Sequence, residues 1–246
     1  MSDRERHAVQ AGSFGAAAAQ YERGRPGYPA EALDWLLPAS ASRVLDLGAG
    51  TGKLTRQLLG RGLEVVAVEP SEGMRSELRR ALGEVCALAG SAEQIPLADG
   101  AVEVVLVAQA WHWVDLERAV PEVARVLAPG GRLGLVWNLR DERVDWVAEL
   151  TRIIRGVEQE LHSGNPTVGP PFGPIERFDV EWTQQLTLPM LLDMVASRSY
   201  VITLPDERRA AVLADVRELV DRHPELSGRQ QIAMPYVTRC SRTHRD

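Results

Sequence analysis

Short apolar runs alternate with amphipathic stretches over the first 140 residues of the chain. The runs are rich in Val and Leu and are bounded by Gly, Pro or charged residues, which is typical of buried strands. The stretches between them repeat apolar residues every three or four positions, which indicates helices. This pattern predicts strands at 43–47, 64–68, 85–89, 102–107 and 132–137, helices at about 53–60, 71–82 and 116–127, and a turn at Pro129-Gly130-Gly131.

The rhythm changes after Trp137. The later residues predict helices at 146–161, 189–197 and 206–222, a loop rich in Pro and Gly at 163–174, and strands at 178–188 and 231–238. Strands joined through helices form a parallel sheet that is covered on both faces. The predicted fold class is therefore α/β, with a doubly wound, mostly parallel, seven-stranded sheet, an antiparallel last strand and inserted helices.

Composition narrows the function classes. Of 246 residues, 45% are apolar and the formal net charge is -6, which argues against nucleic acid as a partner. The short basic segment 238–245 is interpreted as a solvated chain end. With no secretory h-region and no apolar run near the ~20 residues of a membrane span, we expect a cytoplasmic protein without a membrane partner. Two cysteines exclude a disulfide framework and a four-cysteine metal site, and Cys86 is expected to be a small buried residue.

Three alternating glycines, Gly48, Gly50 and Gly52, follow the first predicted strand. Glycines there permit a tight turn and let a ligand approach the backbone at the edge of the sheet. A dinucleotide fingerprint would require a small residue at Lys53, and no P-loop pattern occurs. The spacing indicates a nucleoside-like ligand other than a dinucleotide, and the alternative is a turn that only joins strand to helix.

Two acids flank this turn. Asp46 precedes the first glycine by two residues, and Glu69 closes the second predicted strand. A carboxylate repels a pyrophosphate but attracts a ligand that carries an ammonium and a sulfonium. An acid at the end of the second strand is placed to accept both hydroxyls of a ribose.

These residues carry a family resemblance. Residues 44–52 resemble the first motif of class I S-adenosylmethionine-dependent methyltransferases, and residues 90–100 and 126–131 resemble segments of the type 11 branch. Residues 109–113 and 21–29 are similar to the subgroup with trans-aconitate methyltransferase-like proteins. The good matches cover about residues 14–138, and 197–200 and 235–238 extend them less securely. The resemblance implies a Rossmann-like methyltransferase fold in one domain, 1–246, with an N-terminal flap (1–40), a donor-binding core (41–140) and acceptor-pocket helices with the last two strands (141–246).

The resemblance also implies roles for donor-binding residues. Backbone around the glycine turn would line the methionine part, Asp46 would orient its amino group through water, and Glu69 would hold the ribose. The implied S-adenosylmethionine site consists of Asp46, Gly48, Ala49, Gly50, Thr51, Gly52, Glu69, Pro70, Met74, Ala92, Glu93 and Gln109. Pro70 and Met74 would flank the adenine, Ala92 and Glu93 would meet its edge, and Gln109 would approach the methionine end through its carbonyl. Simpler roles compete: Met74 as core, Glu93 as a helix-terminal acid and Pro70 as a strand stop.

Methyl transfer is an in-line displacement that depends on positioning and on exclusion of water. His112 has a pKa range suited to a base, and Arg25 can pair with an acceptor carboxylate. Tyr21 and Tyr28 lie in the same N-terminal flap as Arg25, and these four residues are the candidates for catalysis. Packing within the protein is the competing interpretation for each of them, and a pocket-lining role for Trp137, Asn138 and Arg140 is less favoured.

The leading hypothesis is an enzyme that methylates a carboxylate or hydroxyl oxygen of a small molecule, with S-adenosylhomocysteine as product and no metal. The alternatives are a non-catalytic donor-binding or regulatory protein, a nucleic-acid methyltransferase and, more distantly, an NAD-dependent dehydrogenase. The nucleic-acid alternative lacks an Asn/Asp-Pro-Pro-Tyr/Phe motif after the fourth strand, where residues 109–112 stand instead. We expect a monomer or a homodimer.

Overall fold

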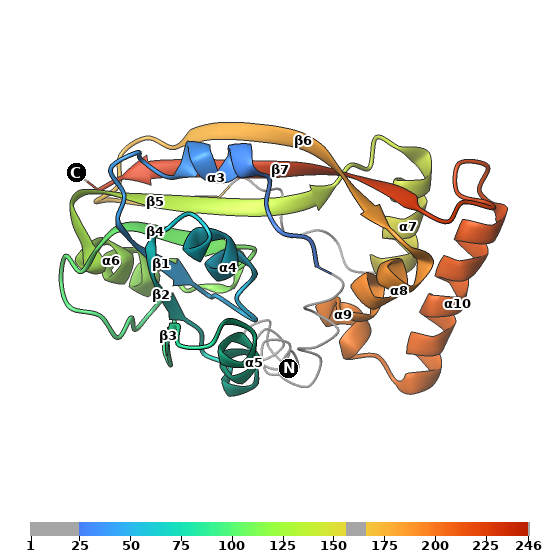
Figure 1. Cartoon of the computed structure of the whole chain (residues 1–246), viewed down its shortest axis with the longest axis horizontal. Coiled ribbons are helices and arrows are strands. Elements are labelled where there is room, and N and C mark those ends of the chain that lie inside the picture. The colour runs from blue at the N-terminus through green and yellow to red at the C-terminus, as the bar shows by residue number, and fades with distance from the viewer. Residues whose placement is uncertain (1–24, 156–165, 246) are drawn as a thin grey trace. The chain divides into compact units, whose positions relative to one another are not determined.

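One seven-stranded sheet organises the computed structural model, which describes residues 25–155 and 166–245. The strand order is β3-β2-β1-β4-β5-β7-β6 (Figure 1). Its members are β1 (Arg43–Leu47), β2 (Glu64–Val68), β3 (Cys86–Leu88), β4 (Val102–Ala108), β5 (Leu127–Arg140), β6 (Glu176–Leu186) and β7 (Ile232–His244). The pairs β1–β2, β1–β4, β2–β3 and β4–β5 are parallel, whereas β7 runs opposite to β5 and β6 (Figure 1). The predicted fold class is confirmed.

Helices cover both faces of the parallel strands. α3 (Ala30–Leu36) and α4 (Lys53–Leu59) bury leucines against Val44, Val104 and Val136. The strand order runs outward from β1 in one direction and from β4 in the other. Right-handed crossovers therefore place α4 and α5 (Glu72–Leu82) on one face and α6 (Leu116–Val126) on the opposite face.

The chain separates into two compact units. The sheet unit comprises Gly27–Asn138, Leu161–Val180 and Thr238–Asp246, and the helical unit comprises Met1–Pro26, Leu139–Glu160 and Glu181–Val237. The boundary falls within β5, β6 and β7, so these three strands belong to both units. The predicted single domain with its three parts stays a prediction.

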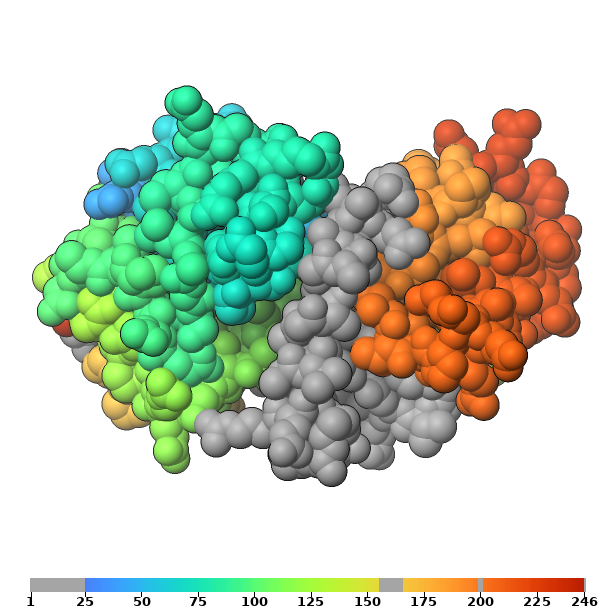
Figure 2. Space-filling model, turned by 90° about the horizontal axis from the view of Figure 1, so that it is seen from below, coloured from blue at the N-terminus to red at the C-terminus, as the bar shows by residue number. Residues whose placement is uncertain are grey.

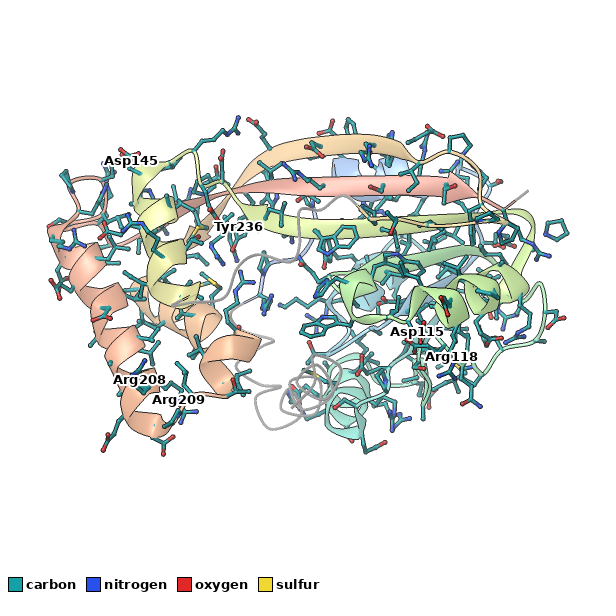
Figure 3. The ribbon with its side chains drawn as sticks, turned by 180° about the vertical axis from the view of Figure 1, so that it is seen from behind. Asp115, Arg118, Asp145, Arg208, Arg209 and Tyr236 are labelled. Atoms are coloured by element: carbon teal, nitrogen blue, oxygen red, sulfur yellow. The ribbon has the colours of Figure 1, made fainter. Side chains whose placement is uncertain are left out.

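The helical unit has its own apolar core. Its helices are α7 (Asp145–Arg155), α8 (Leu188–Ala196), α9 (Ser199–Ile202) and α10 (Asp206–Arg222). Leu150, Leu191 and Leu219 are almost completely buried in this core. Tyr236 on β7, labelled in Figure 3, stacks on Trp182 with ring centroids 5.1 Å apart. Among the described helices, none combines the length and apolarity needed to span a bilayer.

Two predictions about the strands at the far end of the sheet are wrong. The segment 238–245 is not a solvated end, because Thr238, Cys240 and Thr243 are buried in β7. The predicted turn at Pro129-Gly130-Gly131 lies inside β5, where two β4 residues, Val102 and Val104, pair with Leu127 and Arg132. The extra residues bulge out of the ladder, so β5 begins before this segment and runs through it, whereas the prediction has the strand begin after it.

The structure also differs from the sequence predictions in several local features. Cys86 is exposed because β3 is the edge strand, which corrects the expectation of a buried thiol. α3 and α9 are not among the predicted helices: α9 has only four residues, too few to show helical periodicity, and α3 lies before the strand–helix alternation that begins at residue 43. The helix predicted at 146–161 is described only from Asp145 to Arg155, and residues 156–161 lie outside the described residues.

Candidate functional site

The carboxyl ends of β1 and β4 form the switch point of the sheet. β1 pairs with β2 on one side and with β4 on the other, and their following helices leave to opposite faces. Ligands of open α/β sheets bind at such a point. A Cβ atom on Gly48 would lie 3.0 Å from the Cβ of Ala110, so the segments after the two strands are close together. Gly48, Gly50 and Gln109 therefore share one edge of the sheet.

Different physical reasons favour glycine at the three positions of the turn. All three have positive φ, at 75° for Gly48, 58° for Gly50 and 88° for Gly52, which a side chain would strain. A Cβ on Gly52 would lie 2.9 Å from Leu78 and Leu82, so this glycine lets α4 begin close to α5. A Cβ on Gly50 would have no neighbour within 4 Å. The backbone at Gly50 is therefore open to an approaching ligand.

Glu69 directs its carboxylate into this turn. One carboxylate oxygen accepts a hydrogen bond from Gly50 N at 3.0 Å, and the other accepts one from Ser71 N at 2.9 Å. Arg75 donates to the main-chain carbonyl of Glu69 at 2.6 Å. Burial raises the pKa of Glu69, and the hydrogen bonds from Ser71 and Gly50 oppose this shift. Each oxygen keeps acceptor capacity, so the carboxylate can receive two further hydroxyl donors.

Asp46 is a fully buried acid beneath the turn. The hydroxyl of Thr55 donates to Asp46 Oδ2 at 2.6 Å, while Asp46 Oδ1 has no hydrogen-bond partner among the described residues. Burial raises the pKa of Asp46 to about 7, although the Thr55 hydrogen bonds lower it. A buried acceptor without a partner is costly, so a cationic donor near it would be favourable. Thr55 had no sequence signal, because only the helix geometry of α4 brings it under β1.

Residues around the proposed adenine position lie on α5 and on the loop after β3. Met74 is buried in the first turn of α5, and Pro70 is exposed. Ala92 is buried, whereas Glu93 is half-buried. Glu93 Oε1 accepts a hydrogen bond from Asp115 N at 2.9 Å, at the start of α6 (Figure 3). This contact gives Glu93 a structural partner in addition to any ligand.

Gln109 has a strained backbone at the end of β4. Its φ is 61°, a value that a residue with a side chain rarely adopts. Gln109 N donates to Val136 O at 2.9 Å, and its side-chain Nε2 lies 3.4 Å from Asn138 O. Strain of this kind is commonly kept at functional sites. The conformation turns the chain sharply at the edge where the glycine turn lies.

The described candidates for catalysis lie on separate elements of the chain. His112 lies in the 3-10 helix η1 (Trp111–Trp113), and its ring is 4.7 Å from the Trp113 ring. Tyr28 is buried among apolar residues of α3 and α4, and its main-chain N and O exchange hydrogen bonds with the Gln57 side chain. Arg25 belongs to the helical unit, where Nη2 lies 3.4 Å from Ser197 O. Tyr21 lies outside the described residues.

Side chains of the types that can ligate a metal ion are dispersed over the described ranges. No cluster of three or more His, Cys, Asp or Glu side chains suited to a metal ion occurs within 25–155 and 166–245.

Comparison with known proteins identifies the family. Residues 45–135 match the family model described as a methyltransferase domain. An uncharacterized methyltransferase of Mycobacterium tuberculosis (strain H37Rv) is 59% identical over 230 residues, 94% of each chain. The chain belongs to the class I S-adenosylmethionine-dependent methyltransferases. The enzyme prediction and the family prediction are therefore confirmed.

Other relatives of the methyltransferase extend this picture. A structure from Anaeromyxobacter dehalogenans, described as a type II methyltransferase, has a TM-score of 0.68 and 25% identity, and the match covers 89% of this chain and 97% of that one. A malonyl-[acyl-carrier protein] O-methyltransferase of Methylococcus capsulatus is 35% identical over 176 residues, 61% of this chain and 63% of that protein.

Proposed function

We propose that the methyltransferase binds S-adenosylmethionine at the carboxyl ends of β1 and β4 and methylates a carboxylate or hydroxyl oxygen of a small molecule. The observation that carries the donor site is the Glu69 carboxylate, which bonds to Gly50 N and keeps free acceptor capacity. When bound, the donor supplies an electrophilic methyl group on a sulfonium.

The chain's own residues suit the parts of this donor. Glu69 accepts the two ribose hydroxyls, and the unpartnered Oδ1 of Asp46 faces the positive charge of the amino acid part, directly or through water. The open backbone of the glycine turn lines the methionine part. The adenine lies between Pro70 and Met74, with Ala92 and Glu93 at its edge, and Gln109 turns its carbonyl toward the methionine end.

A carboxylate acceptor is favoured over a hydroxyl. A carboxylate is already a nucleophile and needs no general base, so the catalytic task reduces to positioning and water exclusion. His112 is the candidate base if the acceptor is a hydroxyl. The relative from Methylococcus capsulatus is by name a malonyl-[acyl-carrier protein] O-methyltransferase. Arg25, Tyr28 and Tyr21 stay predicted acceptor-binding residues, and the Arg25 guanidinium is suited to pair with a carboxylate.

Calorimetry with S-adenosylhomocysteine tests the donor site. The wild-type protein is expected to bind, and Glu69→Ala should weaken binding at least ~tenfold because hydrogen bonds to a charged group are lost. Glu64→Gln is the matched control, since Glu64 is an exposed acid at the other end of β2. Absence of binding by the wild type, or equal binding by Glu69→Ala, would contradict the proposed site.

Methyl transfer from labelled donor into a metabolite extract tests the acceptor class. A carboxylate product is a methyl ester, which releases labelled methanol on mild alkaline treatment. A hydroxyl product is an ether and keeps its label. Label that stays on nitrogen or carbon, or that enters RNA or DNA, would overturn the proposed acceptor class while leaving the donor site intact.

A further inference from the structure

The loop between β3 and β4 begins with a tight turn. Ser91 N donates to Gln94 O and Gln94 N donates to Ser91 O, both at 3.2 Å. The central pair of this turn is Ala92 and Glu93, the two residues proposed to meet the adenine edge. The position of the adenine edge therefore depends on what holds this turn in place.

On one side the loop rests against the end of β2. A Cβ atom on Gly90 would lie 2.6 Å from Pro96 and 3.1 Å from Val68, the residue before Glu69. Only glycine allows this approach, so the loop and the ribose-binding acid are packed together. Figure 2 shows the segment from α5 to β4, teal to green, on the surface of the sheet unit. The loop thus lies at the surface of the unit with Ala92 and Ile95 buried beneath it, and it needs anchoring.

On the other side two residues of α6 anchor the loop. Ile95 N donates to Glu122 Oε2 at 2.9 Å. Arg125 donates from Nη2 to Ile95 O at 2.9 Å, and from Nη1 to Leu97 O at 2.7 Å and to Asp99 Oδ1 at 2.9 Å. Both backbone groups of Ile95, the residue directly after the turn, are therefore bonded to one pair of side chains, and Ile95 O also accepts a hydrogen bond from Leu97 N at 2.8 Å.

The two side chains also hold each other. Arg125 Nε and Nη2 donate to the two oxygens of Glu122 at 2.8 and 2.9 Å. This hydrogen bonding lowers the pKa of Glu122 and raises that of Arg125. Both side chains are partly exposed, Arg125 at 31% and Glu122 at 24%, so the ion pair by itself adds little stability. The pair instead holds the planar guanidinium of Arg125, with its hydrogen-bond donors, in a fixed position over a loop that belongs to no strand.

We infer that Glu122 and Arg125 form a positioning pair, which sets donor affinity by holding the Ser91–Gln94 turn where its central residues meet the adenine. Neither side chain touches the donor. The inference rests on the proposed donor site.

The test compares two probes by calorimetry. S-adenosylhomocysteine carries both the adenosine and the amino acid, whereas 5′-methylthioadenosine lacks the amino acid. Arg125→Ala should weaken both by the same factor, about tenfold. Asp46→Asn should weaken only S-adenosylhomocysteine, which shows that the assay separates the two ends of the site. Arg209→Ala is the matched control, because Arg209 also pairs with an acid three residues away on a helix, and it should leave both affinities unchanged.

A conservative pair of variants separates positioning from general stability. Glu122→Gln keeps an acceptor for Ile95 N and should retain most of the affinity, whereas Glu122→Ala should lose as much as Arg125→Ala. If Arg125→Ala does not fold, the Glu122 pair decides. Wild-type affinities in Arg125→Ala and Glu122→Ala, or a loss confined to S-adenosylhomocysteine, would refute the inference. A wild type that binds neither probe would instead refute the proposed donor site.

Discussion

Replacement of Asp46 by Asn tests both the burial of this acid and its proposed role. Desolvation raises the pKa of Asp46 from 3.8 to about 7, against the opposing hydrogen bonds of Thr55. A pKa above the unfolded-state value means that the folded protein retains the proton between these two pH values. The Asp46 contribution to stability is therefore greatest below pH ~4 and is lost as the pH rises to ~7. Three units at about 1.4 kcal/mol each correspond to about 4 kcal/mol.

The assay is urea unfolding of wild type and Asp46→Asn between pH 4 and pH 8. Carboxylates distant from Asp46 titrate alike in both proteins, so the difference in unfolding free energy reports Asp46 together with its smaller charge interaction with Glu69. We expect this difference to move in favour of the variant as the pH rises, by up to about 1.4 kcal/mol per pH unit, and to level off above pH 7. The unpaired amide hydrogens of Asn add a cost that does not vary with pH. A constant offset at all pH values would refute the reasoning.

The affinity for the donor should depend on pH in the opposite direction to stability, and fall as the pH falls. If Asp46 faces the amino acid part, its proton must be released for binding below pH 7. Wild-type affinity for S-adenosylhomocysteine should then fall by up to about tenfold per pH unit below pH 7. Asp46→Asn should bind more weakly at pH 8 and show no such slope. An identical slope in both proteins would remove Asp46 from the donor site.

The remaining predictions concern backbone strain and thiol exposure. In urea unfolding, Gln109→Gly should have a free energy of unfolding about 1 kcal/mol higher than Gln109→Ala, because glycine relieves the positive φ that alanine retains. The reverse order would show that Gln109 is not strained. In native protein, a thiol reagent should label Cys86 quickly and leave Cys240 unreacted, because Cys240 is buried and burial raises its pKa to about 12. Labelling that persists unchanged in Cys86→Ser would contradict this assignment.

Local chemistry along the chain accounts for much of the fold. The runs at 43–47 and 64–68 coincide with β1 and β2, and the helix predicted at 206–222 coincides with α10. These elements are long or strongly patterned, so propensity and burial point to the same state. The glycine turn, Asp46 and Glu69 are predictable in the same way, because their placement at strand ends is a property of chain order.

Other features depend on partners far away in the chain. Thr238 and Thr243 look solvated in the sequence, but they are buried in β7, where their hydroxyls donate to Asn138 Oδ1 and to Gly173 O. A polar residue is stable in a sheet interior only when such an acceptor is present. No local sequence pattern predicts an acceptor that lies 70 or 100 residues away.

The same reason explains what the sequence does not predict around the proposed donor site. The Thr55 hydroxyl reaches Asp46, and Arg125 reaches the carbonyls of Ile95 and Leu97, only after helices have packed on the sheet. The order of residues along the chain specifies which of them stand at the ends of the strands, since periodicity and glycine spacing are local. Which of them are buried, charged or anchored is set by the folded molecule, because those properties depend on neighbours that the fold supplies.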